Sequence, residues 1–239
     1  MSGHSHARTV KRKKDADAAQ RSKLFSKLAN ELSIAAKEGA DPQSNSRLRI
    51  VIERARSFNM PTANIERAIQ RGAGQGAGIS LQEVLFEGYG PGGIAVLVEG
   101  ITDNKNRTIN EIKQVFDKNQ GKLAGEGAVR WMFDRKGALV LPPQEQAKEE
   151  LELLAIEAGA EDLYWREDGI LELYTKPAEI EQVRTKLQEK GLTPESLSLD
   201  WVSKERVEIS PQEKEAAERL FEALDENEAV QEIYANSKE

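Results

Sequence analysis

A glycine-rich stretch, Gly72-Ala-Gly-Gln-Gly-Ala-Gly78, divides the chain into two parts with different hydrophobic periodicities. Before it, apolar residues recur at helical spacing, and after it short apolar runs alternate with helical segments. Glycines at alternate positions favour a flexible connection. The stretch follows a helix, precedes a strand and lacks a Gly-Lys-Ser/Thr ending, so a nucleotide-binding loop is not expected and no cofactor is predicted.

Three amphipathic helices are predicted in residues 1–75. The first carries Leu24, Leu28 and Leu32 at helical spacing and ends near Gly39. The second runs from about Arg47 to Phe58. The third starts at Pro61, which suits a first helical position because its missing N–H would be unpaired there, and stops at Gly72. These helices predict a small three-helix bundle.

The charge of the chain is divided in the same way as its periodicity. Residues 1–78 hold 15 Lys and Arg and 7 Asp and Glu, a net charge of +8. Residues 79–239 hold the other 19 and 34, a net charge of −15. A basic end of this kind favours contact with a polyanion, while the acidic remainder repels one. The alternative is a solvated bundle with a disordered tail, in which the charges have no partner.

The residues expected to contact nucleic acid lie mostly in the basic part. Residues 1–14 are too polar to pack, so we expect an arm that orders on its partner. Arginines seven residues apart, as at positions 47 and 54 or 49 and 56, are predicted on the outside of the second helix. Two further cations at a later helix N-terminus are placed to hold a phosphate. The full set is His4, Arg8, Lys11, Arg12, Lys13, Lys14, Arg21, Lys23, Lys27, Arg47, Arg49, Arg54, Arg56, Arg67, Arg71, Lys105 and Arg107.

The order of elements after residue 79 predicts an α+β, multidomain fold. Strands and helices alternate as in two ferredoxin-like (split β-α-β) domains, each with helices on one face of an antiparallel sheet. We expect residues 79–136 and 205–239 to form one discontinuous domain and residues 137–204 to be inserted in it. Within this part, Ala128–Phe133 is interpreted as a strand and Asp134–Gly137 as a turn.

No catalytic group or metal site is predicted. Cysteine is absent, and the two histidines, His4 and His6, lie in the polar arm without carboxylate or thiolate partners. An N-terminal copper or nickel chelate through His4 is a weaker alternative to its contact with a phosphate or base. No apolar run is long enough to cross a bilayer, and no secretory signal is recognised. We therefore expect a cytoplasmic, monomeric binding protein that is not an enzyme.

Several motifs carry a resemblance to a known family. They are Gly3-His4-Ser5, Asp41-Pro42, Asn59-Met60-Pro61, Asn64-Ile65-Glu66-Arg67-Ala68-Ile69, the Gly88–Gly93 turn, and Thr102-Asp103-Asn104 with Asn106-Arg107-Thr108. Over nearly its whole length the chain resembles the YebC family, which includes the mitochondrial translational activator of cytochrome c oxidase. The resemblance implies one helical and two α+β domains, the middle one discontinuous. His6-Ala7 stands where the family usually has Lys-Trp.

The resemblance implies a regulator of gene expression, described in the family either as a DNA-binding transcriptional regulator or as a translation factor at the ribosome. We see no helix with the Asn, Gln and Arg pattern used to read bases in a major groove, and a sequence-blind basic surface suits folded RNA. The favoured partners are therefore ribosomal RNA or tRNA and the ribosome, with duplex DNA as the alternative. A protein-interaction scaffold is a third possibility.

Overall fold

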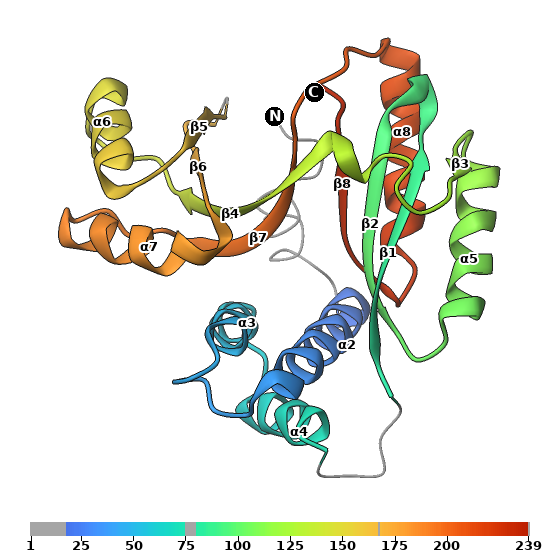
Figure 1. Cartoon of the computed structure of the whole chain (residues 1–239), viewed down its shortest axis with the longest axis horizontal. Coiled ribbons are helices and arrows are strands. Elements are labelled where there is room, and N and C mark those ends of the chain that lie inside the picture. Colours follow the sequence, from blue (N-terminus) through green and yellow to red (C-terminus); the bar gives the residue numbers. More distant parts are fainter. Residues whose placement is uncertain (1–17, 75–79, 167, 239) are drawn as a thin grey trace.

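Three helices form the first unit of the structure, as the hydrophobic spacing predicted (Figure 1). The computed structural model describes residues 18–74, 80–166 and 168–238. The helices are α2 (Ala18–Ala35), α3 (Ser46–Ser57) and α4 (Thr62–Gly72), and a short 3-10 turn, η1 (Ala36–Glu38), follows α2. Their common core contains Leu24, Leu28, Leu32, Leu48, Val51, Ile52, Ile65 and Ala68. None of the described helices is long and apolar enough to cross a membrane.

Asn45 fixes both the start of α3 and the path that leads to it from α2. Its Oδ1 accepts a hydrogen bond from the backbone N–H of Leu48 at 2.9 Å, which caps the helix. Its Nδ2 donates to the carbonyl oxygens of Ala35 and Gly39 at 2.8 and 2.7 Å. One buried amide therefore satisfies backbone groups at the end of one helix and at the beginning of the next.

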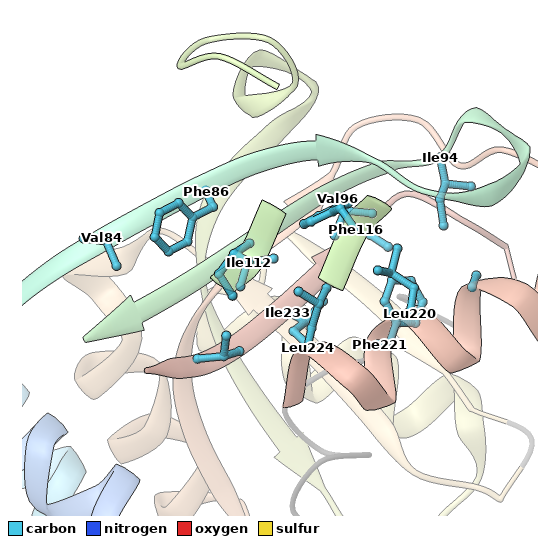
Figure 2. Packing of buried hydrophobic residues seen from close by; sticks show 14 residues of the cluster. Val84, Phe86, Ile94, Val96, Ile112, Phe116, Leu220, Phe221, Leu224 and Ile233 are labelled. Atoms are coloured by element: carbon cyan, nitrogen blue, oxygen red, sulfur yellow. The ribbon is translucent and has the colours of Figure 1, made fainter. Parts of the chain in front are cut away.

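The first sheet is antiparallel with the strand order β3-β1-β2-β8. Its strands are β1 (Gln82–Tyr89), β2 (Ala95–Thr102), β3 (Lys122–Leu123) and β8 (Val230–Ala235), and its helices are α5 (Lys105–Lys118) and α8 (Pro211–Asp225). A short 3-10 turn, η2 (Pro91–Gly93), joins β1 to β2. Figure 2 shows Phe116 of α5 and Leu220 and Leu224 of α8 packed on this sheet. Because side chains alternate along a strand, other residues, such as Leu97 and Tyr234, point to the opposite face of the sheet, where they are buried in a second cluster.

The second sheet is also antiparallel, with the order β5-β6-β4-β7. Its strands are β4 (Phe133–Leu141), β5 (Asp162–Trp165), β6 (Leu171–Thr175) and β7 (Ser196–Ser203), and its helices are α6 (Lys148–Ala158) and α7 (Ile180–Glu189). Two 3-10 turns, η3 (Arg130–Met132) and η4 (Pro177–Glu179), precede β4 and α7. Because β6 lies between β4 and β5, the segment β4-α6-β5 is a split β-α-β unit.

The predicted fold class is confirmed: a helical bundle precedes two α+β units, and the second interrupts the first. The first sheet draws β1 to β3 from the middle of the sequence and β8 from its end. The turn expected at Asp134–Gly137 does not exist, because β4 continues through it and the expected boundary after residue 136 falls inside that strand. A Cβ on Gly137 would lie 3.0 Å from the Cβ of Ile180, so this glycine permits close packing of α7 on β4.

Candidate nucleic-acid interface

The predicted contact residues fall into three groups in the structure. His4, Arg8, Lys11, Arg12, Lys13 and Lys14, together with the predicted arm, lie outside the described residues. Of the others, some join the helical bundle to the acidic α+β units or form contacts within their own unit, and the rest are exposed on the bundle or on α5. The second and third groups decide how much of the basic charge is available to a partner.

Two of the predicted cations form contacts between units, Lys27 as a buried side chain and Arg54 as a largely buried one. Lys27 is 4% exposed, and its Nζ donates to both the carbonyl oxygen and Oδ1 of Asp225 at the end of α8, each at 2.9 Å. Arg54 reaches Glu31 of α2 at 3.2 Å and Glu232 of β8 at 2.5 Å. Burial opposes the charge of Arg54, but the two carboxylates outweigh burial and raise its pKa above the ordinary value.

Arg47 and Arg49 also turn toward the α+β units. Arg47 forms an ion pair with Glu83 at the start of β1, and its Nη1 lies 3.3 Å from Glu38 Oε1. Burial lowers the pKa of Arg47, but its bond to Glu83 and the nearby carboxylates raise it overall. Arg49 donates to the carbonyl oxygen of Pro42 at 3.0 Å and lies 3.5 Å from Glu181 of α7.

These contacts correct the prediction that Arg47 and Arg54 lie on the outside of the bundle. Each is on the polar side of α3, as its spacing indicated, but that side faces the acidic units (Figure 1). In a further ion pair the carboxylate belongs to the bundle and the cation to the α+β units: Glu53 of α3 lies 2.9 Å from Arg184 of α7. Part of the charge asymmetry in the sequence therefore holds the units of this protein together.

Two other predicted contact residues form hydrogen bonds or ion pairs within their own unit. Arg71 fastens α4 to α2 by donating to Ser33 Oγ and to the carbonyl oxygen of Ala29, both at 2.9 Å, and burial lowers its pKa. Arg107 pairs with Asp103 at 2.6 Å. Its backbone N–H donates to the Oδ1 of Asn104, the N-cap of α5, so that donor is already used at the helix terminus proposed for a phosphate.

The remaining predicted cations are on the surface. Arg21, Arg56, Arg67 and Lys105 have exposed side chains. Within the described part of the chain, none of these four forms an ion pair with a carboxylate. Lys23 is half-buried; burial first, and then the neighbouring charge of Lys27, lower its pKa. The sequence-predicted residues thus form no single cluster in the described chain.

A cavity of about 370 Å³ lies where the bundle and both sheets meet. Its polar lining is centred on Glu99 of β2, which accepts hydrogen bonds from Arg135 at 2.7 Å, Trp201 Nε1 at 2.9 Å and Tyr234 OH at 3.2 Å. Burial raises the pKa of Glu99 despite these donors. Arg54 Nε also lies in this region, buried and without a hydrogen-bond partner among the described residues. The cavity is a charged junction between units.

One buried carboxylate, which the sequence did not single out, shapes a loop on the first sheet. Glu87 of β1 accepts hydrogen bonds from the backbone N–H groups of Gly127 at 2.7 Å and of Val129 and Arg130 at 2.8 Å. Burial would raise the pKa of Glu87, but these three donors outweigh it and hold the pKa below its ordinary value. The segment from Gly127 to Arg130 is therefore folded around a charge.

Replacing Glu87 by glutamine should lower the free energy of unfolding at pH 7 by about 2 kcal/mol, because an amide offers one acceptor oxygen to three N–H groups. Urea denaturation checks this. The pKa of Glu87 is lowered by folding, so its contribution is complete above the unfolded pKa of about 4.3 and is lost as the pH falls through the folded value. The difference between wild type and Glu87→Gln should therefore shrink below pH 4. An equal difference at pH 7 and pH 3 would contradict this account.

Comparisons with known proteins place the chain in a family. Residues 5–75 match the family described as the TACO1/YebC protein N-terminal domain, and residues 81–237 match the TACO1/YebC second and third domain.

A probable transcriptional regulatory protein of Caldanaerobacter subterraneus is 42% identical over 238 residues, covering 99% of this chain and 98% of that protein. One from Listeria monocytogenes is 43% identical over 240 residues, covering 100% and 99%. The crystal structure of a conserved hypothetical protein from Aquifex aeolicus superimposes with a TM-score of 0.85 at 42% identity, covering 92% of this chain and 91% of that one. The chain therefore belongs to the TACO1/YebC family.

Proposed function

We propose that this protein is a nucleic-acid-binding regulator of gene expression that acts as a ribosome-associated translation factor and aids the synthesis of stall-prone peptide sequences. The observation that carries the proposal is the set of arginines left exposed after the bundle has made its contacts with the acidic units. Arg21, Arg56 and Arg67 lie on α2, α3 and α4, one on each helix. The relatives are named probable transcriptional regulatory proteins, which supports a role in regulating gene expression.

Folded RNA is the favoured partner for two physical reasons. Cations distributed over three helices suit phosphates that are presented in several directions, as they are on a folded RNA. The α+β units are acidic and repel a polyanion, so they favour approach through the basic end. The protein would act by binding, in the cytoplasm, without a cofactor or a catalytic step.

Duplex DNA is the second candidate, and one helix favours it, contrary to the sequence-based expectation that no helix carries base-reading side chains. On α4, Arg67 and Gln70 are exposed and Asn64 is half-buried one turn before Arg67, so all three repeat at a spacing of three residues. Asn, Arg and Gln are the side chains that pair with adenine and guanine edges in a major groove. Arg67 Nη1 lies 3.4 Å from Asn64 Oδ1, so these two side chains already contact each other on the helix surface.

The triple variant Arg21→Gln, Arg56→Gln, Arg67→Gln should weaken binding of a labelled 30-nucleotide RNA hairpin by about tenfold or more. It should also reduce the slope of log K against log salt concentration by about 2 to 3, because each of the three lost phosphate contacts removes about 0.7 to 0.9. Fluorescence anisotropy from 50 to 300 mM KCl measures both. A 30-base-pair duplex of mixed sequence, titrated in parallel, decides between the two candidates.

A matched variant controls for the loss of three positive charges. Lys113→Gln, Lys118→Gln, Lys214→Gln removes the same charge from exposed positions on α5 and α8. It should retain wild-type affinity within about twofold if the exposed face of the bundle is the binding surface. Equal losses of RNA affinity in the two triple variants would mean that net charge alone, and not the exposed face of the bundle, explains the effect. Failure of the wild-type protein to sediment with purified ribosomes at 50 mM KCl would count against the ribosomal role.

A further inference from the structure

Two exposed aromatic side chains converge on a single carbonyl group at one end of the first sheet. Trp131 of η3 is 64% exposed and Tyr89, the last residue of β1, is 38% exposed. The indole Nε1 donates to the carbonyl oxygen of Ala128 at 3.1 Å, and the phenol OH donates to the same oxygen at 3.3 Å. Among the described residues, these are the only aromatic side chains that are classed as exposed. We call the pair the aromatic platform.

The aromatic platform is held in place by the buried structure beneath it. Its anchor residue, Ala128, lies in the segment that the Glu87 carboxylate organises. Val129 is fully buried and its carbonyl accepts the N–H of Met132 at 2.9 Å, which fixes the turn that presents Trp131. The two rings are therefore exposed on a rigid support, and a partner need not order them when it binds.

A single exposed aromatic residue on a protein surface needs no explanation. Two rings on one anchor differ, because each forgoes part of the free energy that full burial would provide. Their common exposure indicates a surface for planar ligands.

Three cations belong to the segments that form or adjoin the aromatic platform. Lys122 of β3 is the antiparallel partner of Tyr89, and its side chain is exposed. Arg130 precedes Trp131, is exposed, and places its guanidinium 5.1 Å from the ring centre of Trp201. Lys204 donates to the carbonyl oxygen of Trp131 at 2.9 Å.

The carboxylates near the platform leave part of this positive charge available. Asp134 lies 3.4 Å from Lys204 and neutralises it in part, and Glu126 is exposed in the same loop. The Glu87 carboxylate is buried and fully engaged with backbone N–H groups. Lys122 and Arg130 form no ion pair with a carboxylate in the described part of the chain. Planar rings flanked by such cations match a ligand with flat faces and a negative backbone.

We propose that the aromatic platform binds unpaired nucleotides, whose bases stack on Trp131 and Tyr89 while a phosphate meets Lys122. Stacking on aromatic side chains is tolerant of sequence because every base has a π-face. This inference rests on the proposed function, since it assigns a second contact to the same nucleic acid. The platform would distinguish single-stranded segments from duplex, which the arginines of the bundle alone do not.

The aromatic platform and the bundle are separate surfaces. The bundle contacts the beginning of β1, where Arg47 pairs with Glu83, and the platform is at the other end of that strand, at Tyr89. A strand of this length spans on the order of 20 Å. A nucleic acid that reaches both must therefore extend along the first sheet, and each surface can be altered without changing the other.

The test compares Trp131→Ala with wild type on three labelled probes of equal length: a 20-nucleotide single-stranded RNA, the same sequence as DNA, and an abasic DNA strand that has phosphates but no bases. Trp131→Ala should bind the RNA about tenfold more weakly, because one stacked base is lost. Trp131→Phe, which keeps a ring, should stay within about threefold of wild type. The abasic strand should bind all variants equally, because it has no base to stack. The RNA and DNA arms identify the source of the unpaired bases.

Leu153→Ala is the matched control, because Leu153 is 63% exposed on α6, in the other α+β unit. It should not change the affinity for any probe. If Trp131→Ala binds the RNA and DNA strands as wild type does, the platform is not a stacking site and the proposed function stands. If wild type binds no strand at all, abasic included, both the proposed function and this inference fail. Circular dichroism of Trp131→Ala should match wild type, because the side chain is exposed.

Discussion

Arg54→Ala should lower the free energy of unfolding by about 3 to 5 kcal/mol, the largest effect expected of any charged residue in the bundle. The guanidinium holds Glu31 of α2 and Glu232 of β8, and the side chains of the three residues are only 14, 24 and 11% exposed. Removing the arginine leaves two carboxylates facing each other in a space from which water is largely excluded. Urea denaturation followed by tryptophan fluorescence measures the change.

Arg56→Ala is the control for this prediction, because Arg56 lies two residues further along α3 and is exposed. It should change stability by no more than about 0.5 kcal/mol. Adding Glu232→Gln to Arg54→Ala should recover part of the loss, since it removes one of the two unpaired charges. Similar losses for Arg54→Ala and Arg56→Ala would mean that the contact between α3 and β8 does not stabilise the folded protein.

These two arginines also separate folding from binding. Arg54→Ala is expected to weaken the attachment of the bundle to the acidic units, and Arg56→Ala to weaken RNA binding while leaving stability intact. Limited proteolysis within the glycine-rich stretch, residues 72–78, reports on the attachment independently of RNA. Faster cleavage of Arg54→Ala, with unchanged cleavage of Arg56→Ala, is the expected result.

Gly72→Ala should cost about 3 kcal/mol or more and lower the melting temperature by roughly 6 to 12 °C. A Cβ at this position would lie 2.2 Å from the carbonyl oxygen of Ser33 and 2.8 Å from the Cβ of Ala36. Both belong to the segment formed by α2 and η1, so the helices must separate to admit one methyl group. The hydrogen bond from Ser33 Oγ to the carbonyl of Ala68, 2.8 Å long and buried, would be stretched as they do.

Gln70→Ala is the control, because Gln70 is exposed two residues earlier on α4. Alanine is a good helix former, so this change should leave the melting temperature within about 2 °C of wild type. Differential scanning calorimetry compares the two variants. A Gly72→Ala protein as stable as wild type would mean that α4 can shift away from α2 without loss of packing.

The helical unit and the alternation of strands and helices could be predicted because they depend on periodicity, which is local. Leu24, Leu28 and Leu32 indicate a buried helix face whatever lies opposite it. The side of α3 that carries Arg54 was correctly assigned as polar. What it faces could not be predicted, because Glu232 is far away in sequence and is brought to Arg54 only by the pairing of β8 with β2.

Other features were missed because one residue type has several structural uses. Gly72 was correctly interpreted as the end of a helix, because it is the last residue of α4, but its close contact with α2 was not predicted. Gly137 indicated a turn but lies inside β4. Trp131 was not singled out, because it lies in a short apolar run that was interpreted as a strand. Neither the aromatic platform nor the Glu87 cluster has a recognisable spacing.

The two-segment construction of the first sheet has a consequence for the synthesis of this protein. Strands β1 to β3 leave the ribosome early, but α8 and β8, which supply Leu220, Leu224 and Ile233 to their core, emerge only after the whole second sheet has been made. At typical elongation rates this delay is on the order of ten seconds. The bundle and the inserted unit each have all of their strands or helices earlier, so they can fold during translation. The first α+β unit completes its core last. A chain that terminates before residue 230 would lack β8 and leave part of the apolar face of this unit exposed.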